Sequence, residues 1–217
     1  MASPSIPELI RETLAQIASF DEAQIKDLQE ALAATPPGVY RKDVIPQVMQ
    51  RIQLIPPDQS EQVIEALFGL SLGRFQADAP LVEFVEDVVD EVPQVEGQKR
   101  DVLRERLSVL LETDCLKVGA KAYELLFEHE HNFLNARILT DVRPLFGESP
   151  GVSLIGAMVI HTLNINYVQS NKQQSFYIAL DERDVKKLIE VLERAKSKAA
   201  SLRTVLTNAQ LPYVGVE

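Results

Sequence analysis

Glu128-His129-Glu130-His131 is the one short segment of this sequence in which metal-binding residue types cluster. Histidine and carboxylate side chains bind zinc and other transition metals. In an extended segment His129 and His131 point the same way and could share an ion, whereas at a helix end they diverge by about 200°. No cysteine or further histidine stands nearby to supply a third ligand. We expect a solvated helix end, with His129 and His131 as the candidate ligands if the segment is extended, and we predict no cofactor.

A second set of polar residues lies among apolar ones in the later part of the chain. His161 occupies a position typical of a hydrogen-bonded core or interface residue, and a pH-sensitive contact is the alternative, because histidine changes its charge near neutral pH. Arg137, Asp141 and Arg143 predict an ion pair across neighbouring strands or, alternatively, a docking site for an anion. Together with Tyr177, the residues His161, Arg137 and Arg143 are our candidate interaction residues.

The sequence gives little support for enzymatic chemistry. Its single cysteine, Cys115, follows Asp114, and acidic neighbours raise the pKa of a thiol, so a core or helix-start residue is expected rather than a nucleophile. The phosphate-binding, dinucleotide-binding, nucleophile-elbow and zinc-protease motifs are all absent from the sequence. We therefore predict that the protein is not an enzyme.

Acidic and basic residues are distributed unequally along the 217 residues. Residues 134–217 hold 10 Lys and Arg against 8 Asp and Glu, and residues 1–133 hold 12 against 24. An acidic surface argues against nucleic-acid binding by the first part. A single cysteine fits a reducing compartment, the segment Met1–Pro4 does not begin a signal peptide, and no apolar run reaches 18 residues. We expect a cytoplasmic protein that does not bind membranes.

Prolines divide the first part into short amphipathic helices. Apolar residues recur there at spacings of three and four, which is the pattern of a helix with one buried face. The predicted helices begin near Ser5, after Asp21, at Arg41 (ending at Gln53), near Pro56 and after Asp78, and two more span 98–112 and 114–128. Helices of this length pack as a bundle, so residues 1–133 are predicted to form an acidic helical domain.

The second part changes to the period of two that strands show. Strands are predicted at 136–143, ending before Pro144, at 154–167 and around Phe176–Leu180, with a turn at 169–172. Asp181 is expected to cap a long helix that ends near Leu206. Residues 134–206 thus form a βββα domain, followed by an apolar tail at 207–217 that docks either on its own domain or on a partner.

This arrangement predicts pairing between two copies. One helix covers only one face of a three-stranded sheet, which leaves the other face and both edges open. We therefore expect a homodimer through the βββα domain. Binding of nucleic acid by the basic side chains of the last helix is a less favoured alternative, because Tyr167, Phe176 and Tyr177, the aromatic residues available as stacking platforms, are needed by the sheet.

Four segments of the second part, Ala136–Phe146, His161–Leu163, Phe176–Asp181 and Glu193–Leu202, look like an uncharacterised family of bacterial proteins. That resemblance implies a shape and no activity. In the order of its elements, the region 134–206 also resembles the COMM-domain proteins. These have a helical domain followed by a three-stranded antiparallel sheet and one helix, and the resemblance implies pairing through that module as scaffold subunits.

The prediction is an α+β protein, with an all-helical N-terminal domain followed by a three-stranded antiparallel sheet and one long C-terminal helix. We expect a non-enzymatic interaction or scaffold subunit that dimerises through the βββα module and offers its acidic helical part to another protein subunit. The alternatives are a sensor or enzyme that binds a small ligand or metal between the two domains, and nucleic-acid binding through the last helix.

Overall fold

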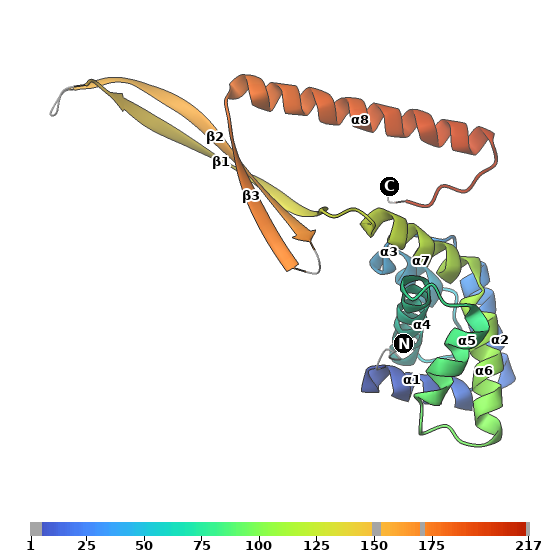
Figure 1. The fold of residues 1–217 in the computed structure, drawn as a ribbon. Coiled ribbons are helices and arrows are strands. Elements are labelled where there is room, and N and C mark those ends of the chain that lie inside the picture. Colours follow the sequence, from blue (N-terminus) through green and yellow to red (C-terminus); the bar gives the residue numbers. More distant parts are fainter. Residues whose placement is uncertain (1–5, 149–152, 170–171, 216–217) are drawn as a thin grey trace. The chain divides into compact units, whose positions relative to one another are not determined.

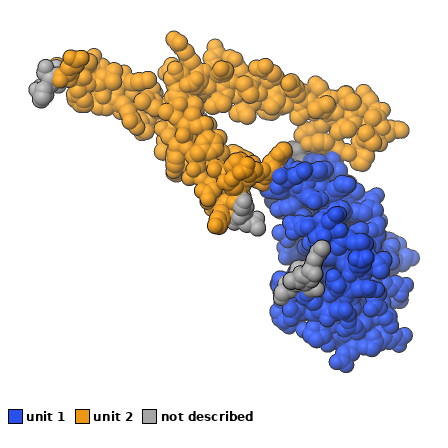
Figure 2. All heavy atoms as spheres, in the orientation of Figure 1, with its two compact units in different colours: residues 1–128, 214–217 blue, residues 129–213 orange. Residues whose placement is uncertain are grey.

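The computed structural model describes residues 6–148, 153–169 and 172–215. The chain divides into two compact units: unit 1 comprises residues 1–128 and 214–217, and unit 2 comprises residues 129–213 (Figure 2). The described residues form a set of helices, then a three-stranded antiparallel sheet, then a long helix, which confirms the α+β prediction (Figure 1). The centre of the predicted turn at 170–171 and the loop residues 149–152 lie outside the described part.

Unit 1 contains seven helices in its described part, and the prolines separate them as the sequence predicts. Pro7, Pro56 and Pro80 each stand immediately before the first residue of a helix, where a missing backbone N–H costs nothing. The predicted helix beginning at Arg41 is shorter than expected, because it ends at Met49 rather than Gln53. The helices are α1 (Glu8–Ser19), α2 (Glu22–Ala33), α3 (Arg41–Met49), α4 (Pro57–Gln76), α5 (Leu81–Asp90), α6 (Gln98–Leu111) and α7 (Asp114–Phe127).

The ends of these helices follow from local chemistry. Asp21 caps α2 as predicted, since its carboxylate accepts a hydrogen bond from the Gln24 amide at 2.8 Å and the Gln24 side chain accepts one from the Asp21 amide in return. At the other end of α4, Asp78 has a positive φ of 48°, a left-handed conformation that stops the helix. The chain then reaches Pro80 and begins α5.

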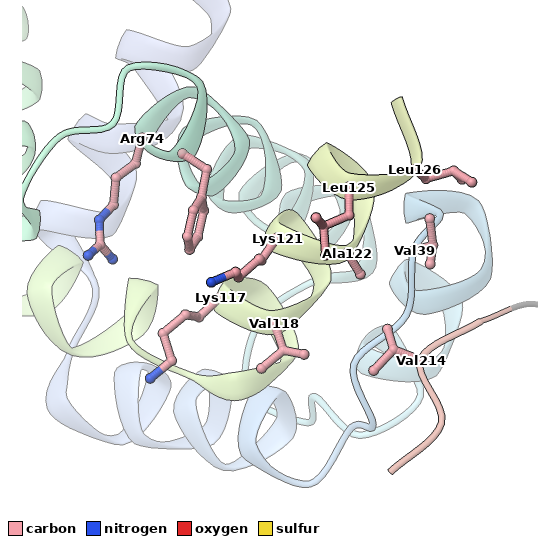
Figure 3. A pocket seen from close by; sticks show the side chains of 10 residues that line it. Val39, Arg74, Lys117, Val118, Lys121, Ala122, Leu125, Leu126 and Val214 are labelled. Carbon is pink, nitrogen blue, oxygen red and sulfur yellow. The ribbon is translucent and has the colours of Figure 1, made fainter. Parts of the chain in front are cut away.

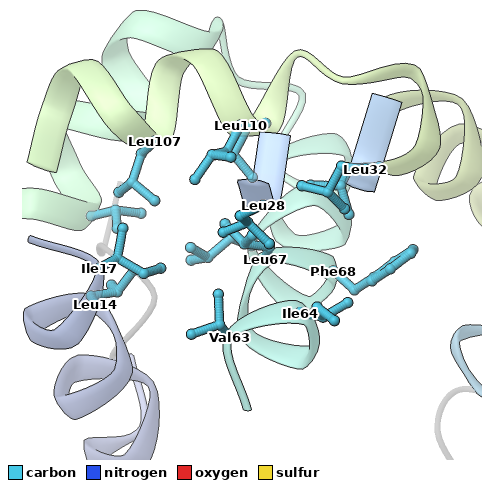
Figure 4. Close-up of a cluster of buried hydrophobic side chains, with 14 of the residues drawn as sticks. Leu14, Ile17, Leu28, Leu32, Val63, Ile64, Leu67, Phe68, Leu107 and Leu110 are labelled. Atoms are coloured by element: carbon cyan, nitrogen blue, oxygen red, sulfur yellow. The ribbon is translucent and has the colours of Figure 1, made fainter. Parts of the chain in front are cut away.

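The hydrophobic core lies in unit 1, where the helices bury their apolar faces against one another (Figure 4). Its largest fully buried side chains include Leu14, Leu67 and Leu107. Leu9 is an apolar residue of α1 that lies outside this core and is 61% exposed. The reason is geometric, because Leu9 precedes Leu14 by five residues and therefore lies about 140° around the helix from it.

Arg106 is a charged residue within this core that sequence reasoning did not identify. It is buried on α6, and its Nη1 donates hydrogen bonds to the carbonyl oxygens of Ile17 at 2.8 Å and Ala18 at 3.3 Å. Its Nη2 donates to the carboxylate of Glu22 at 2.8 Å. Arg106 therefore satisfies carbonyl groups at the end of α1 that have no partner within that helix.

Unit 2 begins with a sheet of three antiparallel strands in the order β1-β2-β3. The strands are β1 (Asn132–Phe146), β2 (Leu154–Gln169) and β3 (Lys172–Leu180). The prediction that the first strand stops before Pro144 is wrong, because Pro144 lies within β1 opposite Ala157. Proline has no backbone N–H to donate. It fits there because β1 is an edge strand, and the Pro144 nitrogen can lie on the side of β1 that pairs with no other strand.

The last helix, α8 (Glu182–Asn208), is capped as predicted. The Asp181 carboxylate accepts hydrogen bonds from the amides of Arg183 and Asp184 at 2.8 and 2.9 Å. However, the expectation that this helix covers one face of the sheet is wrong. All of α8 is described, and none of its residues is buried. Only one residue, Asp181, separates β3 from α8, which is shorter than the two to six residues that usually connect a strand to a helix lying back on its sheet.

Candidate interaction surface

The register of the sheet sorts its side chains onto two faces, because neighbours along a strand point to opposite sides. Leu163 is paired with Ile138 on β1 and with Ile178 on β3, so these three apolar side chains form a row across the sheet. Rows of the same parity make up what we call the apolar face: Phe133, Ala136, Ile138, Thr140, Val142, Pro144, Ala157, Val159, His161, Leu163, Ile165, Tyr167, Gln174, Phe176, Ile178 and Leu180.

The apolar face is open to solvent in the single chain. Val142 is 67% exposed, and Ile138, Val159 and Phe176 are also exposed. Among the described residues of unit 2, Leu180 is the only buried hydrophobic side chain. A contiguous exposed apolar surface of this kind marks a place where another molecule binds.

The sheet narrows to two strands beyond the end of β3. Leu180, the last residue of β3, pairs with His161, and from there the residues 141–146 of β1 and 154–160 of β2 continue as a ribbon of two strands. A two-stranded ribbon is only marginally stable in water by itself. This one also carries exposed apolar side chains on both faces, with Val142 on one and Met158 on the other. The ribbon therefore leaves apolar side chains exposed on both of its faces in the single chain.

The long helix α8 presents a second exposed apolar surface. Its apolar residues recur at spacings of three and four over 27 residues, or roughly 40 Å. Leu192, near the middle of this row, is 62% exposed. We call the row the α8 stripe: Val185, Leu188, Ile189, Leu192, Ala195, Ala199, Leu202 and Leu206. The structure thus exposes the helix stripe and the sheet face together.

The other face of the sheet brings together two of the predicted interaction residues. Arg137 and Tyr177 are the cross-strand neighbours of Asn164, one on each side of it. Asn164 is 2% exposed, and its Oδ1 accepts no hydrogen bond from the described residues. Sequence reasoning missed Asn164, because its place in the alternating pattern resembled that of a solvated residue. A buried oxygen without a donor is a position where a partner's polar group would be stabilised.

The predicted ion pair at Arg137, Asp141 and Arg143 is wrong, since none of the three forms an ion pair with any described residue. All three lie on the same face of β1, and their neighbours on β2 are uncharged. Arg143 lies opposite Met158, and Asp141 lies opposite Ile160. Their charges remain available to a partner on that face.

The histidines occupy separate places. His161 lies half-buried on the apolar face, where its Nδ1 is 2.8 Å from the hydroxyl of Thr140. The His131 ring packs edge-on against Tyr167, with centroids 4.9 Å apart, and the His129 carbonyl accepts a hydrogen bond from the Asn132 side chain at 2.8 Å. Within the described ranges, no three His, Cys, Asp or Glu residues are grouped as a metal site would require.

Cys115 is buried in unit 1, and burial raises the pKa of its thiol to about 11. The direction agrees with the sequence expectation, but the cause differs. Desolvation, rather than an acidic neighbour, disfavours the thiolate, and the nearby charge of Arg51 opposes the shift only in part. A thiol in this state is a poor nucleophile.

Compared with protein-family models and with curated proteins, the sequence gives no match. None of the helices in the described part of the chain combines the length and the apolar character needed to cross a bilayer.

Proposed function

We propose that this protein is a non-enzymatic interaction subunit that pairs with a second copy of itself through unit 2. The observation that carries the proposal is α8, an amphipathic helix of 27 residues without one buried side chain, which follows a sheet whose apolar face is also exposed. The helix and the sheet thus offer two apolar surfaces that do not cover each other within one chain. When two chains associate, the helix of each chain can cover the sheet of the other.

In the proposed dimer, the α8 stripe of each copy lies on the apolar face of the other copy's sheet. The dimensions agree, because α8 extends for roughly 40 Å and the 16 residues of β2 for roughly 50 Å. The single-residue connection at Asp181 disfavours the same contact within one copy. The contact is reciprocal, as in most two-fold symmetric dimers.

The apolar side chains are sufficient in number to drive this association. Burying a large aliphatic side chain contributes about 1.5–3 kcal/mol, so Leu188, Ile189, Leu192 and Leu202 contribute on the order of 8 kcal/mol in each helix. Reciprocity doubles this to on the order of 16 kcal/mol before the sheet is counted. The sum is of the size needed to offset the roughly 4–15 kcal/mol that association costs in lost freedom.

Unit 1 has a different role in the proposal. Its core is complete, and its surface carries most of the acid of the chain, so it is free to present an acidic face to another protein subunit. The resemblance of the βββα element order to the COMM-domain proteins supports a scaffold role. The thiol of Cys115 suits a reducing compartment, which supports a cytoplasmic location.

Sedimentation equilibrium of the full chain tests the proposal. We expect a mass of twice 24.2 kDa at micromolar concentration. Leu192→Asp places a charge in the centre of the α8 stripe and should weaken the dimer by at least about 100-fold, because the two surfaces can then meet only if the carboxylate is buried between them. Ser201→Asp introduces the same charge on the opposite side of α8 and should leave the mass unchanged.

A wild-type chain that stays monomeric at tens of micromolar would contradict the proposal. Equal weakening by Leu192→Asp and Ser201→Asp would contradict the assignment of the α8 stripe, because only Leu192 belongs to the stripe.

A further inference from the structure

Unit 1 carries a groove of about 830 Å³ that the proposed dimer does not use (Figure 3). The end of α4 and the length of α7 form most of it, and Val39 closes one side. The close approach of Val39 depends on Gly119 of α7, because a Cβ at Gly119 would lie only 2.9 Å from the carbonyl oxygen of Gly38. Glycine therefore lets the chain at 38–39 lie against α7 and shape the groove.

The groove combines an apolar wall with a cationic rim. Phe75, Val118, Leu125 and other apolar residues supply the wall, and Leu125 itself is exposed. Three cations lie at the rim, Arg74, Lys117 and Lys121. A cationic rim is unexpected in the half of the chain where acidic residues outnumber basic ones two to one.

The three cations differ in what neutralises them. Arg74 Nη1 and Lys117 Nζ each lie 3.2 Å from a carboxylate oxygen of the same residue, Glu112, and these contacts lower the pKa of Glu112. Lys121 is exposed and has no hydrogen bond or ion pair with any described residue. The groove therefore has an uncompensated positive charge beside its apolar wall, which favours an apolar ligand with a negative charge.

One residue from the end of the chain lines this groove in the structure. Val214, in the segment that follows α8, belongs to unit 1 and lines the groove beside Val118 and Val39 (Figure 3). Leu211 and Tyr213 are exposed, and the chain becomes half-buried at Val214 and Gly215. The sequence 211–217 contains a single charged side chain, the acidic Glu217, and its other residues are mainly apolar.

We infer that the groove of unit 1 is a binding site for an apolar peptide with an acidic residue, and that its occupant is the chain's own segment Val214–Glu217, which belongs to the same unit. Val214 enters the apolar wall, and the charge of Lys121 complements the negative charge of the segment. A tethered occupant binds at an effective concentration in the millimolar range, so it holds the groove against a free peptide of similar affinity.

The test uses a chain that ends at Gln210, which retains α8 and its C-terminal cap, and a fluorescein-labelled peptide with the sequence of 211–217. Fluorescence anisotropy should show saturable binding to the shortened chain. Binding to the full chain should be at least tenfold weaker, because the tethered segment competes. A peptide carrying Val214→Asp should not bind.

Two variants of the shortened chain test the rim. Lys121→Glu should weaken peptide binding about tenfold, and raising the salt concentration should remove most of that difference. Lys99→Glu makes the same change of charge at an exposed lysine of α6 that does not line the groove, and it should leave binding unchanged.

Three results would overturn the inference: no saturable binding to the shortened chain, binding to the full chain that is equally tight, or equal weakening by Lys121→Glu and Lys99→Glu. The inference is independent of the proposed dimer, because the groove lies in unit 1 and the dimer surfaces lie in unit 2. The mass of the shortened chain, measured in the same samples, keeps the two outcomes distinct.

Discussion

Units 1 and 2 both contain amphipathic helices, but the apolar faces of these helices differ in burial. In unit 1, α5 has Phe84, Val85, Val88 and Val89 at helical spacing, and all four are buried within the same chain. In unit 2, α8 has an equally regular stripe, and none of its residues is buried. Periodicity therefore predicts an amphipathic helix, but it does not show whether the same chain buries the apolar face of that helix.

The connections explain the difference between the two units. The residues 77–80 separate α4 from α5, and this length lets the second helix turn back onto its neighbours. A single residue separates β3 from α8. A connection this short disfavours packing of the helix on its own sheet, and in the proposed dimer both surfaces bind the second copy.

Disruption of the proposed dimer should change the proteolysis of unit 2 and leave that of unit 1 unchanged. In the Leu192→Asp variant, α8 should become accessible to trypsin at Lys186, Lys187 and Arg194, because without a partner no residue of the helix is buried. We expect cleavage in α8 at least about tenfold faster than in the wild type, while unit 1 stays intact. Timed digestion followed by mass spectrometry measures both.

The Ser201→Asp variant is the matched control and should be digested at the wild-type rate. Cleavage of α8 in the wild type that is as fast as in Leu192→Asp would show that no partner protects this helix.

A second, smaller effect separates the core of unit 1 from the association of unit 2. Leu107 is fully buried on α6, so Leu107→Ala should lower the free energy of unfolding of unit 1 by about 3 kcal/mol. Val109 lies on the same helix and is 42% exposed, so Val109→Ala should cost less than about 1 kcal/mol. Urea unfolding followed by circular dichroism measures the two costs.

In neither variant should the mass at equilibrium change in the absence of urea. Loss of the dimer in Leu107→Ala, with unit 1 still folded, would contradict the separation of the two units that we propose.

The smallest expected effect is a pH dependence at the start of α8. Backbone hydrogen bonds from the first turn of the helix, above all from Asp184, hold the pKa of Asp181 below its usual 3.8. Because the folded pKa is lower than the unfolded one, the stabilisation is fully present above pH 3.8 and is lost as the pH falls through the folded value. Amide exchange at Asp184 and Val185, corrected for intrinsic rates, should therefore accelerate over this window.

Asp181→Asn provides the control for that titration, because asparagine caps a helix well and has no charge to lose. The change in exchange with pH at these amides should be much smaller in the variant. An identical pH profile in both proteins would show that another group is responsible.

Local signals predicted most of the secondary structure. Asp21 and Asp181 form the predicted caps, and the helices at 98–112 and 114–128 are present with their ends shifted by one residue. Each of these features depends on residues within a few positions of one another, and short-range chemistry decides them.

Features that depend on strand register or on the connection between two elements could not be predicted from short-range sequence patterns. Asn164 becomes buried because the pairing places Arg137 and Tyr177 on either side of it. The absence of an ion pair at Asp141 among the described residues follows from its position opposite Ile160. The exposure of α8 depends on the conformation of one connecting residue, and no periodic pattern encodes that.

In the proposed dimer, the α8 stripe of one copy covers the apolar face of the other. A dimer prepared from an equal mixture of isotope-labelled and unlabelled chains tests it directly, through NMR contacts filtered to report only pairs from different copies. We predict contacts between the methyl groups of Leu188 or Leu192 and those of Ile138 or Ile178. Contacts between these groups that appear only within one copy, or a dimer in which they are absent, would contradict the account.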